Sequence, residues 1–91
     1  MIRTDDLFLG GFALARGGEL VGLEVQTTNG RRVAVFRIAG PGVEDAEREY
    51  FRGTTSVDLQ HLKVQVRRLK ERAFDALRAE ERKTWRESPR R

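Results

Sequence analysis

The sequence predicts a small α+β domain in which helices pack on a β-hairpin. Two β-type runs meet at an Asn-Gly pair, segments with helix-capping residues flank them, and a long amphipathic stripe follows. The expected element order is α-β-β-α-(β)-α, with a long C-terminal amphipathic helix. The chain has 91 residues, enough for one hydrophobic core. We expect a single α+β domain over residues 1–82 and a basic, flexible tail over residues 83–91.

Residues 4–16 predict a short helix with Thr4 as its N-cap, and the two acids that follow favour the positive end of the helix dipole. Gly17-Gly18 supplies the stop. Gly10-Gly11 is unfavourable inside a helix, at about 1 kcal/mol for each glycine relative to alanine. We therefore expect another element to approach the helix backbone closely at this pair. A strand is the alternative, because leucines alternate at the start of the segment.

The hairpin is expected over residues 19–38, with Asn29-Gly30 as a two-residue type I′ turn. Centring the turn on this pair places apolar residues opposite one another on one face. The predicted pairs are Val25 with Ala34, Leu23 with Phe36, and Val21 with Ile38. A slip of one residue would break this match, so the pattern predicts the register. We expect helices to cover this apolar face.

Residues 43–52 predict a second short helix, with Gly53 as its left-handed stop. Residues 54–57 are either an edge strand or a connector. A two-stranded sheet alone is only marginally stable. We therefore expect residues 54–57 or a second copy of the chain to extend the sheet, and we favour a homodimer.

The last helix begins after Asp58 as N-cap and is expected to run to about Ala79, or as far as Trp85, with fraying after residue 82. Apolar residues recur along it at the 3,4 spacing of an amphipathic helix. They are Leu59, Leu62, Val66, Leu69, Ala73 and Ala76. This stripe either covers the hairpin or forms the seam of a dimer.

Composition excludes several classes of function. There is no cysteine and only one histidine, so we assign no disulfide, no metal and no cofactor. Ser56, Asp58 and His61 lie at a helix start, where serine and aspartate are ordinary caps, so we do not expect an enzyme. No run is long enough to span a membrane and no signal peptide is evident, so a cytoplasmic protein with no membrane partner is expected.

Positive charge is concentrated in the second half of the chain. Residues 1–45 carry five arginines and six acids, a net charge of −1, whereas residues 46–91 carry thirteen Lys/Arg and eight acids, a net charge of +5. Fifteen of the basic residues are arginine, whose planar fork suits phosphate, although a GC-rich genome would also enrich arginine. The basic half indicates a polyanionic partner.

A helical wheel gives this partner a candidate site. Cations of the last helix fall within an arc of about 80°, with Phe74 in the middle. They are Lys63, Arg67, Lys70 and Arg78. Cations that contact phosphates beside a ring that stacks on a base are typical of single-strand binding. Alternatively, the cations only border the buried stripe and Phe74 widens the core contact.

Two further groups of residues towards the end of the chain bear on binding. The second candidate is Trp85 among Arg82, Lys83 and Arg86, in which the indole stacks on a base, anchors in a partner or folds back on the core. Arg68 and Arg72 lie on the outer face, at spacings that suit ion pairs with neighbouring acids.

These observations support two hypotheses. The first is a small non-enzymatic nucleic-acid-binding protein, single-strand-specific or non-specific. Its binding residues would be Lys63, Arg67, Lys70, Phe74, Arg78, Arg82 and Trp85. The second is a protein-interaction module, for example a phage or mobile-element accessory protein that docks on a host or phage enzyme.

Three short patterns carry a resemblance. Asp6-Leu7-Phe8-Leu9-Gly10-Gly11-Phe12, Tyr50-Phe51 ahead of Gly53, and Val57-Asp58 occur in this order. Over about residues 4–79 the chain resembles a family of small uncharacterised bacterial and phage proteins, a domain of unknown function. The resemblance implies a helix over residues 4–16 and a phage or mobile-element context, and it implies no site. The chain departs from the family in Gly10-Gly11, where alanines are usual, and in its longer basic tail.

Overall fold

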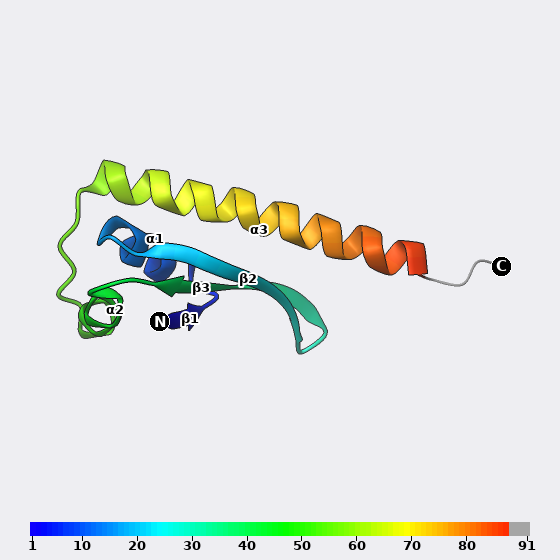
Figure 1. Ribbon diagram of the computed structural model, residues 1–91, viewed down its shortest axis with the longest axis horizontal. Helices are drawn as coiled ribbons and strands as arrows, with labels where there is room; N and C mark the ends of the chain where they lie inside the picture. Colours follow the sequence, from blue (N-terminus) through cyan, green and yellow to red (C-terminus); the bar gives the residue numbers. More distant parts are fainter. Residues whose placement is uncertain (88–91) are drawn as a thin grey trace.

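The structure, a computed structural model, describes residues 1–87, and side chains as far as Arg82. These residues form an α+β fold with a three-stranded antiparallel sheet of order β1-β3-β2 (Figure 1). The elements are β1 (Ile2–Thr4), α1 (Leu7–Ala15), β2 (Glu19–Thr28), β3 (Arg31–Ala39), α2 (Val43–Arg52) and α3 (Leu59–Glu87). The predicted α+β class and long C-terminal helix are confirmed. Of the predicted flexible tail over residues 83–91, residues 83–87 continue α3, and residues 88–91 lie outside the described residues.

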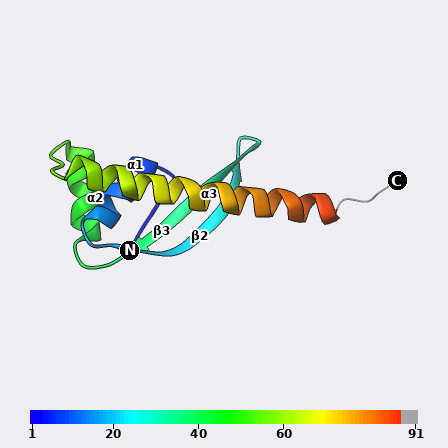
Figure 2. The ribbon, with the colours of Figure 1, turned by 90° about the horizontal axis from the view of Figure 1, so that it is seen from above.

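Helix α3 sets the outline of the molecule. It has 29 residues, which gives a length of about 43 Å at 1.5 Å per residue. Figure 2 shows α3 running over α1 and the sheet, with only its C-terminal end beyond the hairpin turn. Ala73 packs against the core and Leu77 is partly buried, so contact with the rest of the domain continues past the middle of the helix.

The hairpin turn forms where the sequence predicts it. Asn29 and Gly30 have φ values of 54° and 77°, as a type I′ turn requires. The pairs Val25–Ala34 and Leu23–Phe36 are confirmed. The prediction that Val21 pairs with Ile38 is wrong, because a β-bulge lies between Leu20 and Gly22. Leu20 now stands opposite Ile38 and packs on the core, while the extra residue Val21 is left 53% exposed.

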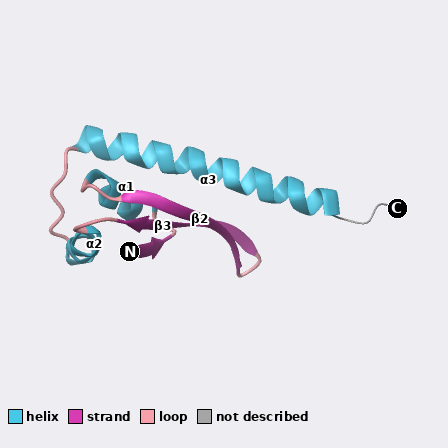
Figure 3. Cartoon of the chain, viewed as in Figure 1, coloured by secondary structure: helices cyan, strands magenta, loops and turns pink. Residues whose placement is uncertain are grey.

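The strand that extends the sheet is β1 and not residues 54–57. Ile2 pairs with Ile38 and is 4% exposed. Residues 54–57 have no regular structure and form the connector between α2 and α3, drawn as a loop in Figure 3. A single chain thus supplies the third strand that a stable sheet needs, and homodimerisation stays a prediction.

Helix α1 is capped by Asp6, so the expectation that Thr4 is the cap is wrong. Asp6 Oδ1 accepts hydrogen bonds from the amides of Phe8 at 2.9 Å and Leu9 at 3.3 Å. Asp6 Oδ2 accepts a third, from the hydroxyl of Tyr50 on α2, at 2.8 Å. Thr4 ends β1, and its hydroxyl accepts the Asp6 amide at 3.0 Å. One carboxylate therefore both caps α1 and ties it to α2.

The expectation that an element approaches Gly10-Gly11 is confirmed, and that element is α3. A Cβ built on Gly11 would lie 2.6 Å from Val66 Cγ2, and one on Gly10 would lie 2.8 Å from Leu69 Cδ1. Real Cβ atoms essentially never come this close to another heavy atom. The two glycines therefore allow α3 to cross α1 at short range, and Leu69 is only 1% exposed at the crossing.

The core lies between one face of the sheet and the helices. Alternate residues of β3 supply its sheet side, together with side chains from β1, α1, α2 and α3. The buried cluster consists of Ile2, Leu9, Ala13, Ala34, Phe36, Ile38, Val43 and Leu69. On the opposite face of the sheet, Arg3 and Glu24 reach across β3 to form an ion pair of 2.8 Å.

Candidate nucleic-acid interface

The apolar stripe of α3 fixes which side of the helix faces solvent. Asp58 caps the helix as predicted, with its Oδ1 accepting the Gln60 amide at 3.2 Å. From Leu62 onward the stripe is buried or partly buried against α1 and the sheet. Leu59, predicted as part of the stripe, is 59% exposed because α3 first meets α1 near Leu62. The helix continues to Glu87, beyond Ala79 and two residues past Trp85, the further of the two predicted ends.

Phe74 projects from the solvent side of α3. It lies about 140° around the helix from Leu69, which marks the centre of the buried side. Its ring is 63% exposed, whereas Leu69 is 1% exposed. The structure therefore places Phe74 in solvent, and the alternative in which it widens the core contact does not hold.

Three cations accompany this ring on the same side of the helix. Lys63, Arg67 and Lys70 are exposed, and within the described part of the chain none of them forms an ion pair. Residues 59–70 contain no acid at all. We call Lys63, Arg67, Lys70 and Phe74 the cationic face. It extends about 16 Å along the helix axis, from residue 63 to residue 74.

The remaining predicted residues are less favourably placed. Arg78 donates a hydrogen bond to Asp75 at 2.7 Å, so its charge is partly balanced. Arg82 is exposed one turn further on. The backbone of α3 continues through Trp85, but the side chain of Trp85 lies outside the described residues. The structure thus brings four of the seven predicted residues together without an ion-pair partner among the described residues. It places Arg78 beside Phe74 but paired with Asp75, exposes Arg82 one turn further on, and does not describe the indole.

The surroundings of Phe74 differ between its two sides. On one side Glu71, Asp75 and Arg78 border a shallow depression. On the other side Lys70 and the apolar residues Leu7, Ala73 and Leu77 line a small hollow of about 140 Å³. Immediately beside the ring, Lys70 therefore offers a phosphate a cation with no ion-pair partner among the described residues, whereas Arg78 on the other side is paired with Asp75.

The sequence did not predict the position of Arg68 and Arg72. Within the described residues neither forms an ion pair with the neighbouring acids, and Asp75 instead pairs with Arg78. Both arginines line a pocket against the start of β2. Helical periodicity places Arg72 about 60° around the helix from the buried Leu69, which indicates the edge of the stripe, but no sequence signal identifies β2 as the element that faces it.

Ser56, Asp58 and His61 lie at or just before the start of α3. Asp58 is engaged as a helix cap, and Ser56 and His61 are exposed. Among the described residues no group of three or more metal-ligating side chains comes together. The helices of the described part of the chain include none that is both long and apolar enough to cross a membrane.

Comparisons of the chain with known proteins found no match. No protein-family model matches the chain, and no curated protein or solved structure is significantly similar to it. The resemblance to a domain of unknown function from bacteria and phages stays a prediction.

Proposed function

We propose that the protein binds single-stranded nucleic acid, with little sequence preference, through the cationic face of α3. One observation carries the proposal. The ring of Phe74 is 63% exposed, and on the same side of α3 lie three cations that have no ion-pair partner among the described residues. Long-range attraction to phosphates and a free aromatic surface for a base are the two components of this mode of binding.

The roles of the residues follow from their positions. Lys63, Arg67 and Lys70 contact successive phosphates along the helix, since they lie in one row. Phe74 stacks on a base at the end of that row, an interaction worth about 1–3 kcal/mol per base. Base faces are hidden inside a duplex, so the ring favours single strands. Stacking on an open helix side tolerates every base, which explains the expected lack of sequence preference.

A charge-reversal experiment tests the proposal. A fluorescently labelled oligonucleotide is titrated with the wild-type protein and with the double variant Arg67→Glu, Lys70→Glu, and anisotropy is followed. The matched control is Arg31→Glu, Arg52→Glu, which changes the net charge equally at exposed positions on other elements. Binding should be lost in the first variant and largely kept in the second. Equal losses in both, or none in either, would contradict the assigned site.

A second candidate function rests on the apolar hollow beside Phe74. A hollow of about 140 Å³ lined by Leu7, Ala73 and Leu77 suits an apolar side chain of a protein partner, as expected of an accessory protein that docks on an enzyme. The absence of oligonucleotide binding even at low salt would favour this function. Light scattering on the same samples measures the mass and so tests the expected homodimer.

A further inference from the structure

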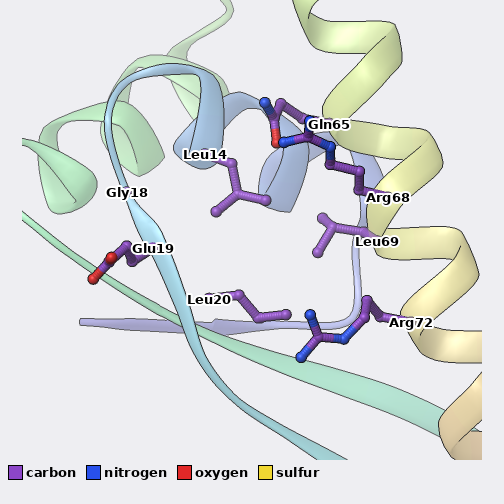
Figure 4. A pocket seen from close by; sticks show the side chains of 8 residues that line it. All are labelled: Leu14, Gly18, Glu19, Leu20, Gln65, Arg68, Leu69 and Arg72. Atoms are coloured by element: carbon purple, nitrogen blue, oxygen red, sulfur yellow. The ribbon is translucent and has the colours of Figure 1, made fainter.

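A second pocket lies on the opposite flank of α3, between that helix, the C-terminal end of α1 and the start of β2 (Figure 4). Its volume is about 310 Å³, at the small end of the range for ligand pockets. Its lining comprises Leu14, Gly18, Glu19, Leu20, Gln65, Arg68, Leu69 and Arg72. Arg72 is about 160° around the helix from Phe74, so this pocket is separate from the cationic face.

The floor of the pocket is aliphatic. Leu14, Leu20 and Leu69 come from α1, β2 and α3, and Figure 4 shows their side chains directed into the space between these elements. Leu69 is 1% exposed, and the other two are half-buried. Leu20 reaches the floor because of the β-bulge that follows it. No aromatic ring lines the pocket, so the floor suits an aliphatic chain better than a nucleobase.

The rim of the pocket is cationic. Arg68 and Arg72 stand one turn apart on α3, and Figure 4 shows Arg68 reaching toward Gln65 and Arg72 reaching toward Leu20, on either side of Leu69. Within the described residues no carboxylate pairs with either guanidinium, and Glu19 points away from them in Figure 4. A guanidinium binds a carboxylate through two parallel hydrogen bonds. Two such groups beside an apolar floor therefore select an amphipathic anion.

We propose that this pocket binds a small carboxylate with an unbranched aliphatic chain, of the fatty-acid type. The carboxylate lies at Arg68 and Arg72, and the chain packs on the three leucines. Both halves of the ligand contribute, since the arginines supply the charge contact and the floor supplies the apolar one. The small volume of the pocket, about 310 Å³, favours a short or medium chain.

Octanoate is the probe that tests this site, titrated into the full chain by calorimetry and by backbone amide NMR. Saturable binding with shifts at Gly18, Glu19 and Leu20 is expected. Hexanoate, two methylenes shorter, should bind about 15-fold more weakly, since each buried methylene contributes about fourfold in affinity. Acetate has the charge without the chain and octylammonium has the chain with the opposite charge, so neither should saturate the pocket.

Charge-removing variants separate the site from general attraction to a basic protein. Arg68→Gln and Arg72→Gln should each weaken octanoate binding by about tenfold or more, the loss of a charge-assisted hydrogen bond. Arg78→Gln removes the same charge from an exposed position of the same helix and should leave octanoate affinity unchanged. Equal binding of octylammonium, wild-type affinity in Arg72→Gln, shifts centred on Phe74 and Lys70, or no binding at all would each overturn the proposal.

Discussion

Substituting Gly11 by alanine tests the packing that positions the cationic face. In an unpacked helix interior this change stabilises by about 1 kcal/mol, because glycine is a poor helix former. Here the added methyl would lie 2.6 Å from Val66 Cγ2, 3.3 Å from Leu62 Cδ1 and 3.4 Å from the Val66 backbone nitrogen. Side-chain rotation can relieve the first two contacts, but the backbone contact limits how far the methyl can move.

The magnitude follows from two opposing contributions. Overpacking of this kind costs about 1–3 kcal/mol, and the gain in helix propensity offsets about 1 kcal/mol of it. Gly11→Ala should therefore lower the free energy of unfolding by up to about 2 kcal/mol, where an unpacked site would show an increase of about 1 kcal/mol. Urea denaturation followed by circular dichroism measures this difference.

A double-mutant cycle with Val66→Ala identifies the cause. Removing the valine methyls takes away the 2.6 Å contact. In the Val66→Ala background, Gly11→Ala should be neutral or stabilising, so the sign of its effect should change between the two backgrounds. If Gly11→Ala stabilises the wild-type protein, or has the same effect in both backgrounds, α3 does not cross α1 at the distance described.

Four further predictions concern the contacts and the turn that hold the fold. Tyr50→Phe removes the hydrogen bond to Asp6 and should lower the free energy of unfolding by about 1 kcal/mol. The same bond raises the pKa of Tyr50, so the absorbance change of this only tyrosine should shift to lower pH in Asp6→Asn, and an unshifted curve would refute the contact. Hydrogen bonding from Arg16 lowers the pKa of Glu49. The stability that this contact contributes is therefore present above the pKa of the glutamate in the unfolded chain, about 4.3, and is lost as the pH falls through its lower pKa in the folded protein. Thermal unfolding measured against pH should show this loss of stability, and Glu49→Gln should make the loss smaller. Gly30→Ala, at a φ of 77°, should destabilise by about 1–2 kcal/mol in urea, and wild-type stability would argue against the type I′ turn.

Local turn and cap chemistry made much of the fold predictable from the sequence. Asn29-Gly30 sets the turn and the register nearest to it, because both residues accept positive φ. Helix α2 has the predicted bounds, Val43–Arg52, because Gly53 ends it in the left-handed conformation. In each case a few neighbouring residues determine the conformation without help from the rest of the chain.

The features that the sequence did not predict depend on distant contacts. An isolated glycine inside a strand run, here Gly22, is a local signal for a bulge, but it does not determine which neighbouring residue is the extra one. The bulge leaves Val21 as the extra residue and places Leu20 on the core. Three residues of β1 are too few to show alternation, and pairing with β3 makes them a strand. Thr4 and Asp6 are both good caps by type, and the strand pairing of Thr4 together with the Tyr50 hydroxyl decides in favour of Asp6.

The candidate site was predictable in part, because helical periodicity is also a local property of the sequence. Helical periodicity alone places Lys63, Arg67, Lys70 and Phe74 away from the apolar stripe, and the structure exposes all four. Periodicity does not determine which acid pairs with which cation. The choice of Arg78 as the partner of Asp75 depends on side-chain conformation.

The salt dependence of oligonucleotide binding tests the proposed function most directly. Three unpaired cations predict a slope of log affinity against log salt of about −2 for a single strand, or a loss of about 20-fold between roughly 50 and 200 mM salt. Lys70→Gln should make the slope shallower by about 0.7, because one phosphate contact is lost. A slope near zero, a slope that Lys70→Gln leaves unchanged, or no binding at the lowest salt would contradict recognition of nucleic acid by the cationic face.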